Sequence, residues 1–293
     1  MREIRMISVV ICTRNRAQAI KKCLSEFEGM KVPIDLTWEL IVVDNNSVDE
    51  TKDVIMAFLE RSNLPLIYKH ENRRGSSNAR NTGIGAARGE IIAFTDDDCI
   101  VTPDWLSCIA HEFRSDPTLS GVGGRVELYD IRDKPFTIRT SLTRSLFSST
   151  DQVFGYIPGC NMAFVREVFD QIGNFDGRFG AGTPLKAAED SDFVYRVYKN
   201  GFKMLYSPEV CVYHNHGRRT DHQVKALKRN YEIGKGAFYC KHIFNGDINV
   251  LKQAYWEITS ALRLIKDILV GTSYYMMIYC KGHVYNKLSR LNR

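Results

Sequence analysis

Three consecutive carboxylates, Asp96, Asp97 and Asp98, follow an apolar run at residues 91–95 that is typical of a buried strand. Like charges this close together raise each other's pKa unless a cation neutralises them. Carboxylate oxygens without paired cysteines suit Mg²⁺ or Mn²⁺, and Mg²⁺ in particular is commonly held by one or two carboxylates together with substrate phosphates. The triplet therefore predicts a metal site with Mn²⁺ or Mg²⁺ as the cofactor; the alternative is a solvated acidic turn.

Another carboxylate, Asp44, stands at the end of a second predicted strand, residues 39–43, and is followed by Asn45, Asn46 and Ser47. Open α/β sheets bind their ligands at the carboxyl ends of the strands. A carboxylate at that place can accept hydrogen bonds from a nucleobase or a ribose. The alternative is that these polar residues only turn the chain and cap the next helix.

Basic residues surround the beginning of a predicted helix at residues 76–87, with Arg73 and Arg74 before it and Arg80 inside it. A helix N-terminus attracts anions through its free N–H groups and its dipole, so we expect a phosphate site here. Residues 83–88 approach the G-x-G-x-x-G pattern, but they lie inside the helix and end in arginine. A dinucleotide site of that type is therefore not expected.

The acidic pair Glu189 and Asp190 begins a further predicted helix, residues 189–199, directly after a glycine-rich loop. A carboxylate in this place can act as a general base, and the alternative is a capping role that favours the helix dipole. Two histidines, His214 and His216, follow a later predicted strand. An imidazole near a carboxylate cluster is a reasonable metal ligand, and the sequence leaves open which of the two it is.

The elements that must position these residues alternate between apolar runs and helical patterns, as in βαβ units on a parallel sheet. The predicted strands are residues 6–12, 39–43, 66–68, 91–95, 122–128, 161–165, a short one near 204, and 210–213; the predicted helices are 17–28, 49–60, 76–87, 103–114 with Thr102 as its cap, and 189–199. From residue 221 the pattern is helical to the end. We therefore expect an α/β fold with a mostly parallel, Rossmann-like sheet and flanking helices. Residues 1–220 would form the catalytic domain and residues 221–293 a basic helical extension.

Composition narrows the class of protein. Of the 293 residues, 44% are hydrophobic and 25% are charged, which excludes disordered and collagen-like chains. None of the eight cysteines forms a C-x-x-C pair, so neither a zinc site nor a disulfide framework is indicated. The apolar stretch near the beginning is shorter than the core of a secretion signal. We therefore expect a cytoplasmic location.

Short segments along the chain match, in order, the motifs of one enzyme family. They are residues 8–16 (SVVICTRNR), 42–47 (VVDNNS), 78–83 (NARNTG), 94–98 (FTDDD), 159–164 (GCNMAF), 189–190 (ED) and 212–216 (VYHNH). On these motifs the chain resembles the inverting family-2 glycosyltransferases of the GT-A fold. The resemblance covers about residues 5–240.

This resemblance implies roles for the matched positions. It implies that Asp98 ligates the metal with His214 as a further ligand, and that Asp190, beside Glu189, is the catalytic base. It implies that Asp44 lies at the nucleobase and that Asp96 and Asp97 lie near the ribose and the donor sugar. The nucleotide-sugar site as a whole would comprise Thr13, Arg14, Asn15, Asp44, Asn46, Arg80, Asp96 and Asp97.

The implied reaction moves a sugar from a nucleoside-diphosphate sugar, expected to be a UDP-sugar, to a hydroxyl of a glycan or a lipid-linked saccharide. A metal and Arg80 would stabilise the leaving diphosphate, and a single displacement would invert the anomeric centre. A sugar-phosphate nucleotidyltransferase would instead want a phosphate loop rich in glycine and lysine after the first strand, which residues 13–16 do not provide. A nucleic-acid-binding module is disfavoured because residues 1–213 carry 26 Lys and Arg against 29 Asp and Glu, or −3.

The C-terminal segment carries the excess positive charge. Residues 214–293 hold 14 Lys and Arg against 5 Asp and Glu, or +9. An apolar stripe at helical spacing comprises Leu251, Tyr255, Ile258, Leu262, Ile265 and Leu269, and residues 268–280 are almost uncharged. A packing face is one interpretation of the stripe. We expect these helices to lie on an anionic membrane surface, at the inner face of the plasma membrane, and the oligomeric state stays open.

Overall fold

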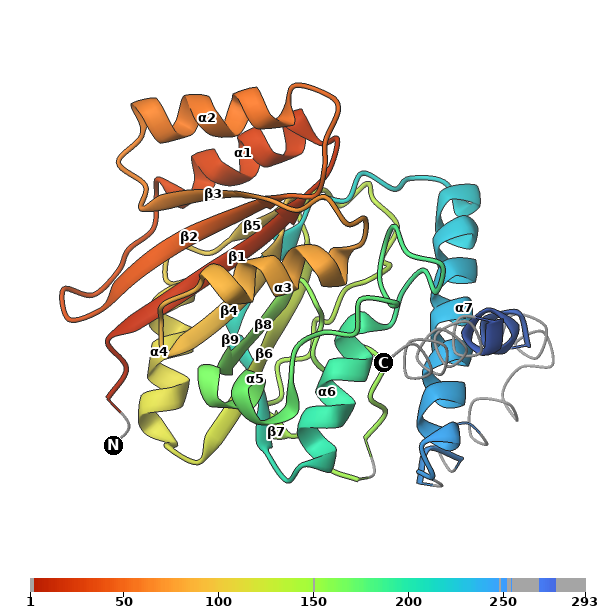
Figure 1. Ribbon diagram of the computed structural model, residues 1–293. Coiled ribbons are helices and arrows are strands. Elements are labelled where there is room, and N and C mark those ends of the chain that lie inside the picture. The colour runs from red at the N-terminus through yellow and green to blue at the C-terminus, as the bar shows by residue number, and fades with distance from the viewer. Residues whose placement is uncertain (1–2, 150, 248, 252–253, 255–268, 278–293) are drawn as a thin grey trace, which may run out of the picture.

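The computed structural model describes residues 3–149, 151–247, 249–251, 254 and 269–277 (Figure 1). In this part of the chain, strands form one mixed sheet in the order β3-β2-β1-β4-β8-β6-β9-β5, with β7 paired to β9. The strands are β1 (Met6–Thr13), β2 (Thr37–Asp44), β3 (Leu66–His70), β4 (Ile91–Asp96), β5 (Cys99–Val101), β6 (Leu119–Leu128), β7 (Ser145–Leu146), β8 (Asn161–Val165) and β9 (Lys203–His214).

The pairings within β3-β2-β1-β4 are all parallel, as the sequence predicted. β1 pairs in parallel with both β2 and β4, and β2 pairs in parallel with β3. β8 enters between β4 and β6 and is antiparallel to both, whereas β6 and β9 are parallel. The carboxyl ends of β1, β2 and β4 therefore meet at one edge of the sheet, where the sequence places Thr13, Asp44 and Asp96.

Helices cover the sheet. They are α1 (Ala17–Phe27), α2 (Thr51–Arg61), α3 (Ser76–Ala86), α4 (Trp105–Ser115), α5 (Arg166–Ile172), α6 (Glu189–Lys199) and α7 (Asp221–Phe244). In the view of Figure 1, α3, α5 and α6 lie in front of the sheet and α7 stands at its side. The middle strands are buried on both faces, which is why β1 and β2 read as continuous apolar runs rather than as alternating ones.

Several predicted boundaries differ from the structure. The helix predicted at residues 103–114 begins at Trp105, because residues 103–104 form a turn in which the Trp105 N–H donates to the Thr102 carbonyl (3.0 Å), so Thr102 is not its cap. The two strands predicted near residues 204 and 210–213 are one strand, β9, whose pairing with β6 shifts register between Gly124 and Arg125. The short elements β5, β7 and α5 had no periodic pattern long enough to be predicted.

An aromatic cluster holds α6 against the sheet. Phe193 of α6 stacks on Phe169 (5.0 Å between ring centroids) and on Phe175 (4.5 Å), and meets Phe164 of β8 edge-on (5.0 Å). Phe193 and Phe164 are fully buried. Because aromatic pairs add to the energy of simple burial, this cluster fixes the helix that begins with Glu189 and Asp190.

The helix α7 begins with a capping box, in which the Gln223 N–H donates to the Thr220 hydroxyl and the Gln223 side chain accepts from the Thr220 N–H. Of the apolar stripe predicted in the tail, Leu251 and Leu269 are described, and Tyr255, Ile258, Leu262 and Ile265 lie outside the described residues. Among the described residues, no helix combines the length and the apolar content needed to cross a bilayer.

Candidate active site

The aspartate triplet lies where β4 turns into β5, and each carboxylate meets different partners. Asp97 accepts a hydrogen bond from the Thr13 hydroxyl (2.7 Å) and pairs with Arg16 (3.1 Å). Asp98 pairs with another nitrogen of Arg16 (2.8 Å) and with Nε2 of His214 (3.3 Å), and Asp96 faces Arg80 (3.4 Å). Two arginines and one histidine thus supply the positive charge that three adjacent carboxylates require.

The pKa values of the two buried aspartates in this turn, Asp97 and Asp98, are shifted in opposite directions. Burial, together with the charges of the neighbouring aspartates, raises the pKa of Asp97 to about 7, although Arg16 and Thr13 oppose it. Burial also disfavours the charge on Asp98, but the hydrogen bond and charge of His214, with Arg16, hold the pKa of Asp98 well below its usual range. These neighbours therefore favour the ionised form of Asp98 despite its burial.

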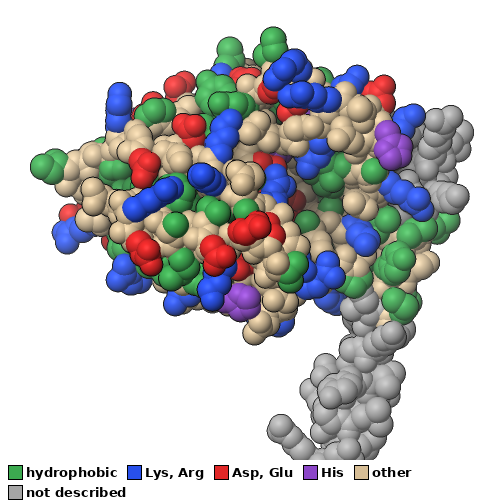
Figure 2. All heavy atoms as spheres, turned by 90° about the horizontal axis from the view of Figure 1, so that it is seen from above, with side chains coloured by type: hydrophobic (Ala, Val, Ile, Leu, Met, Phe, Trp, Pro, Cys, Tyr) green, Lys and Arg blue, Asp and Glu red, His purple; other side chains and the backbone are tan. Residues whose placement is uncertain are grey.

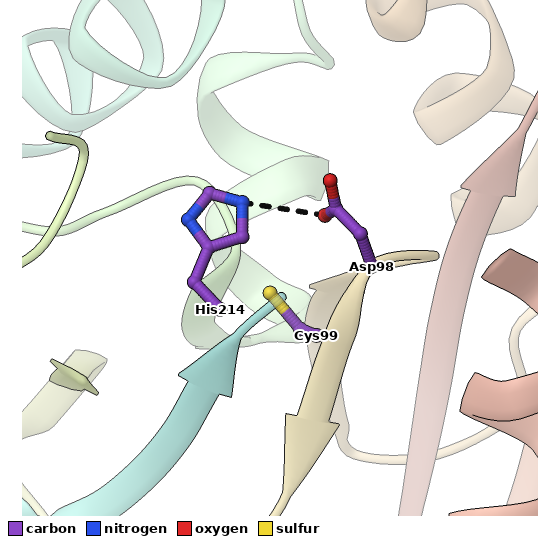
Figure 3. Close-up of side chains that lie close together, drawn as sticks. All are labelled: Asp98, Cys99 and His214. Carbon is purple, nitrogen blue, oxygen red and sulfur yellow. Dashed lines mark ion pairs between the residues drawn. The ribbon is translucent and has the colours of Figure 1, made fainter. Parts of the chain in front are cut away.

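His214 completes the candidate metal centre. Figure 3 shows its ring turned toward Asp98, with Cys99 beside the pair. β5 and β9 are in register at Cys99 and His214, which sets these side chains next to each other. Thr137 lies against the opposite ring nitrogen, Nδ1, through its hydroxyl (3.3 Å) and its carbonyl (3.4 Å), so Nε2 is the nitrogen aimed at Asp98.

The donor set fits a divalent cation. Burial alone would lower the pKa of His214, but the hydrogen bond to Asp98 and nearby negative charge raise it to about 9. The positive charge of the protonated His214 ring then balances the negative charge of the Asp98 carboxylate. A cation held by the same two atoms would supply that charge instead. Carboxylate oxygen and imidazole nitrogen are both ligands of first-row divalent metals.

His216 lies against His214 but has other partners. The two rings are 5.0 Å apart and nearly perpendicular. Nδ1 of His216 accepts from the Arg218 N–H (3.0 Å) and lies 3.6 Å from Asp133. Of the two histidines, His214 is the one that shares the metal-type cluster with Asp98.

The acidic pair occupies the first turn of α6. Ala188, in the left-handed conformation (φ 70°), is the N-cap residue, so Glu189 and Asp190 are not caps but lie in the first turn, where their negative charges favour the helix dipole. Asp190 accepts from the Gly159 N–H (3.0 Å) and from the Ser191 N–H (2.7 Å). Burial and the charge of Glu189 raise the pKa of Asp190 to about 6, against the lowering effect of Arg80.

Glu189 binds the beginning of α3. Its Oε1 accepts from the Ser76 hydroxyl (2.9 Å) and from Arg80 (2.8 Å). Where the sequence predicted a phosphate at the start of this helix, the structure has a carboxylate of the chain itself, because both Arg80 and the helix N-terminus favour a negative charge there. Arg73, also expected at the phosphate site, pairs with Glu71 (2.8 Å).

At the ends of β1 and β2, polar side chains shape the loops. Asp44 is buried and accepts hydrogen bonds from the Ser47 N–H (2.9 Å) and the Tyr68 hydroxyl (3.2 Å). It therefore stabilises the turn after β2, as the alternative interpretation held, and it also lies at the carboxyl edge of the sheet. Arg14 donates to the Asn45 carbonyl (2.9 Å). Asn15 and Asn46 both have positive φ, at 51° and 59°, which asparagine tolerates better than most residues.

A cavity of about 330 Å³ joins these groups. Its lining includes the charged and titratable side chains Arg80, Asp96, Glu189, Asp190 and His214, and a set of aromatic residues with one lysine: Phe136, Phe154, Tyr231 and Lys235. Seen from above in the orientation of Figure 1, the molecule has a recess near its middle with acidic and basic side chains beside it (Figure 2). The cavity brings together five of the residues singled out by the sequence, whereas Thr13, Arg14, Asn15, Asp44, Asn46, Asp97 and Asp98 do not line it.

Some residues at this site could not be identified from the sequence. Arg16 lies within a matched motif, yet nothing in the sequence indicated that it bridges Asp97 and Asp98. Tyr231 and Lys235 stand on α7, outside every matched motif, and no spacing signal connects them to residues 96 or 190.

The sequence of this chain matches family models and relatives that are glycosyltransferases. The model of the family described as "Glycosyl transferase family 2" matches residues 8–173, and that of "Glycosyl transferase family group 2" matches residues 91–281. The chain is 29% identical over 239 residues to a protein of Haloferax volcanii named glycosyltransferase AglE, covering 78% of this chain and 72% of the relative.

Solved structures show the same fold. The mannosyltransferase PcManGT from Pyrobaculum calidifontis, in complex with GDP-Man and Mn²⁺, aligns with a TM-score of 0.66 at 20% identity, over 97% of this chain and 81% of that one. TarS from S. aureus, in complex with UDP-GlcNAc, aligns with a TM-score of 0.60 at 19% identity, over 78% and 66% of the two chains.

Proposed function

This chain belongs to glycosyl transferase family 2 and has the GT-A fold, and from that premise we propose that it transfers a sugar from a nucleoside-diphosphate sugar to a hydroxyl group of an acceptor saccharide. One observation carries the proposal: Asp190, with its raised pKa, lines the same cavity as Asp96 and His214. A proton acceptor thus lies within reach of the edge of the sheet where the donor would bind.

The donor would lie across the carboxyl ends of β1, β2 and β4. Asp44 would accept hydrogen bonds from the base, with Thr13 and Arg14 beside it, and Asn15 and Asn46 would hold the two loops in the shape that admits the nucleotide. Asp96 and Asp97 would contact the ribose and the donor sugar. The two structural neighbours were solved with different nucleotide sugars. We propose a UDP-sugar for this chain, with GDP-mannose as the donor to compare with it.

Asp98 and His214 would hold Mn²⁺ or Mg²⁺. The ion would supply positive charge to the departing diphosphate when it is bound. Arg80, buried between Glu189 and Asp96, adds a fixed cation on the same side of the cavity. Its two carboxylate partners keep it in one position, and such preorganised charge is what stabilises a developing anion.

Asp190 would act on the acceptor. As the acceptor oxygen forms its bond to the anomeric carbon and the bond from that carbon to the diphosphate oxygen breaks, the hydroxyl proton passes to a carboxylate oxygen of Asp190. The Gly159 and Ser191 N–H groups fix the position of this carboxylate. Because the attack comes from the face opposite the leaving group, the product has the inverted configuration.

We propose a glycan or lipid-linked saccharide as the acceptor, and a cytoplasmic location with the basic segment of residues 221–293 against an anionic membrane surface. Residues 221–293 hold 12 Lys and Arg against 5 Asp and Glu, or +7, and this charge supports the placement, at about 1 kcal/mol for each cation near such a surface. Residues 1–220 would form the catalytic domain, with α7 completing the wall of its cavity. Flotation of the full chain with anionic liposomes at physiological salt tests the membrane contact, and protein left at the bottom of the gradient would contradict it.

The enzymatic proposal is tested by measuring nucleoside diphosphate release from UDP-glucose, UDP-GlcNAc and GDP-mannose with Mn²⁺. We expect release from one donor, enhanced by an acceptor and lost in chelator. Release from none of these or other common sugar nucleotides would contradict the proposal. Formation of a nucleotide sugar from a sugar phosphate and a nucleoside triphosphate would assign the nucleotidyltransferase reaction instead.

A further inference from the structure

A thiol stands beside the pair formed by Asp98 and His214. The Cys99 sulfur, a ring nitrogen of His214 and a carboxylate oxygen of Asp98 all lie within 4.8 Å of one another, and all three residues are buried. In Figure 3 the sulfur lies below the dashed line that joins the ring to the carboxylate. Cys99 and His214 are directly opposite each other in the antiparallel pairing of β5 and β9, so their side chains share one face of the sheet. The proposed sugar transfer gives this thiol no role.

A second thiol, Cys160, lies next to the first. Cys160 directly precedes β8, whose Asn161 pairs with Thr95 of β4, so it stands opposite the beginning of the aspartate triplet. A side-chain hydrogen bond with Cys160, together with burial, raises the pKa of Cys99 well above its usual range. Cys160 also lines the cavity together with His214 and acts on that ring electrostatically. We call the resulting cluster the thiol centre: Asp98, Cys99, Cys160 and His214.

The distances in the thiol centre suit a small tetrahedral ion. Ligand atoms around Zn²⁺ lie about 3.3–3.8 Å apart, because its bonds to nitrogen, oxygen and sulfur are about 2.0–2.3 Å long. Nε2 of His214 and Oδ1 of Asp98 are already 3.3 Å apart. An approach of at most about 1 Å would bring the Cys99 sulfur into the same range. Arg16 holds the other oxygen of Asp98 (2.8 Å) and Thr137 lies against Nδ1 of the ring (3.3 Å), which leaves the two facing atoms for a cation.

The two sulfurs change which cation this centre prefers. Mg²⁺ and Mn²⁺ favour oxygen ligands, whereas thiolates favour Zn²⁺ and other thiophilic ions. A coordinating thiol loses its proton to solvent, so Zn²⁺ would form two Zn–S bonds, one Zn–N bond and one Zn–O bond while two thiol protons and the Nε2 proton of His214 leave through the cavity. No atom is oxidised or reduced. The one excess negative charge of the loaded centre lies beside Arg16, which already pairs with Asp98.

We propose that the thiol centre is a zinc site, in which Asp98, Cys99, Cys160 and His214 enclose Zn²⁺ and thereby exclude Mn²⁺ and the diphosphate. Four protein ligands complete the tetrahedral coordination of zinc and leave no open position for a substrate. Zinc binding is independent of the proposed reaction, whereas the inhibition that follows from it rests on the proposed glycosyltransferase function. The two cysteines come from separate segments, which is why no C-x-x-C pair marks the site in the sequence.

Cobalt is the spectroscopic probe for this site, because Co²⁺ binds the same nitrogen and sulfur ligands as Zn²⁺. The full chain, reduced and freed of metal, is titrated with Co²⁺ and then with Zn²⁺. We expect a thiolate-to-cobalt charge-transfer band in the near ultraviolet that saturates at one Co²⁺ per chain and disappears when one equivalent of Zn²⁺ is added.

The variants test the two sulfurs separately. Cys99→Ser and Cys160→Ser should each weaken the cobalt band and lower the affinity for Zn²⁺ at least about 10- to 100-fold more than the affinity for Mn²⁺, the range seen when even an outer partner of a metal ligand is lost. Competition with a chromophoric chelator measures zinc, and electron paramagnetic resonance measures manganese. Cys99→Ala and Cys160→Ala repeat the test without a buried hydroxyl. Cys108→Ser, at a half-buried thiol on α4, is the matched control and should leave the band and both affinities unchanged.

Nucleotide binding tests the exclusion. In the unaltered protein, Zn²⁺ at ten times its dissociation constant should weaken the Mn²⁺-dependent binding of nucleoside diphosphate about tenfold, as simple competition requires. A missing thiolate band, equal losses of zinc and manganese affinity in the Cys99 and Cys160 variants, or unchanged nucleotide binding with zinc bound would overturn the inference. A thiolate band and tight zinc binding in a chain that hydrolyses no donor with any metal would support the zinc site and overturn the proposed function instead.

Discussion

The charged and the aromatic parts of the cavity lining come from different kinds of segment. Among the charged and titratable residues, Asp96 and His214 are the last residues of β4 and β9, and Asp190 lies in the first turn of α6. Among the aromatic residues, Phe136 and Phe154 come from long loops and Tyr231 from α7, which is far away in the sequence. A group at a strand end has its place set by sheet topology, whereas a group on a packed helix depends on how that helix docks.

The largest effect is expected at the base. Asp190→Asn keeps the size of the side chain but removes its ability to accept a proton, so we expect turnover to fall by about 10² to 10⁴ while nucleotide affinity stays nearly constant. Single-turnover kinetics and calorimetric titration with nucleoside diphosphate measure the two quantities. Asp170→Asn, at an exposed position on α5, is the matched control. Near-normal turnover of Asp190→Asn would make its carboxylate a structural group.

The next effect concerns the metal. Asp98→Ala should remove the gain in nucleotide affinity that Mn²⁺ gives the unaltered protein, which we expect to be at least 10- to 100-fold, the range seen when even an outer partner of a metal ligand is removed. Titration with nucleoside diphosphate, with and without Mn²⁺, measures it. If the gain is retained in Asp98→Ala, the metal lies elsewhere and Asp98 is not its ligand.

The pH dependence gives a smaller, graded effect. The pKa of Asp190 is raised to about 6, above the usual value for an aspartate, so its carboxylate is protonated and inactive as a base below that pH. We expect kcat/KM for transfer to be constant above about pH 7 and to fall about tenfold per pH unit below pH 6. Initial rates across this range, at saturating Mn²⁺, measure the profile. A profile that is flat down to pH 4.5 would contradict the role of Asp190.

The smallest effect concerns the packing of α7, measured as a change in stability. Gly234→Ala places a methyl group against the Ala187 carbonyl and should destabilise the protein by about 1–3 kcal/mol through overpacking. Gly85→Ala, in α3, meets nothing within 4 Å and should stabilise the protein by up to about 1 kcal/mol. Urea unfolding of both variants measures the difference. Equal effects of the same sign would mean that α7 does not pack closely against residue 187.

The same contrast explains which parts of the fold and of the site could be predicted from the sequence. The parallel sheet, the aspartate triplet at the end of β4 and the acidic pair at the start of α6 follow from periodicity and motif order, because these features are local. Arg16 closes the first loop after β1, and the sequence could not show that its guanidinium reaches two aspartates more than 80 residues later. Tyr231 depends on the docking of α7 through Gly234 and Lys241, which is a tertiary contact that leaves no periodic signal.

The central claim is that Asp98 and His214 hold a divalent cation facing a donor that shares a cavity with Asp190. A crystal structure of the full chain with Mn²⁺ and the nucleoside diphosphate of its donor, recorded at the manganese absorption edge, tests this claim most directly. We predict one anomalous peak in contact with an Asp98 oxygen, His214 Nε2 and the diphosphate, with the empty space for the sugar opening toward Asp190. A manganese peak away from both residues, or a diphosphate that does not contact the manganese, would contradict the account.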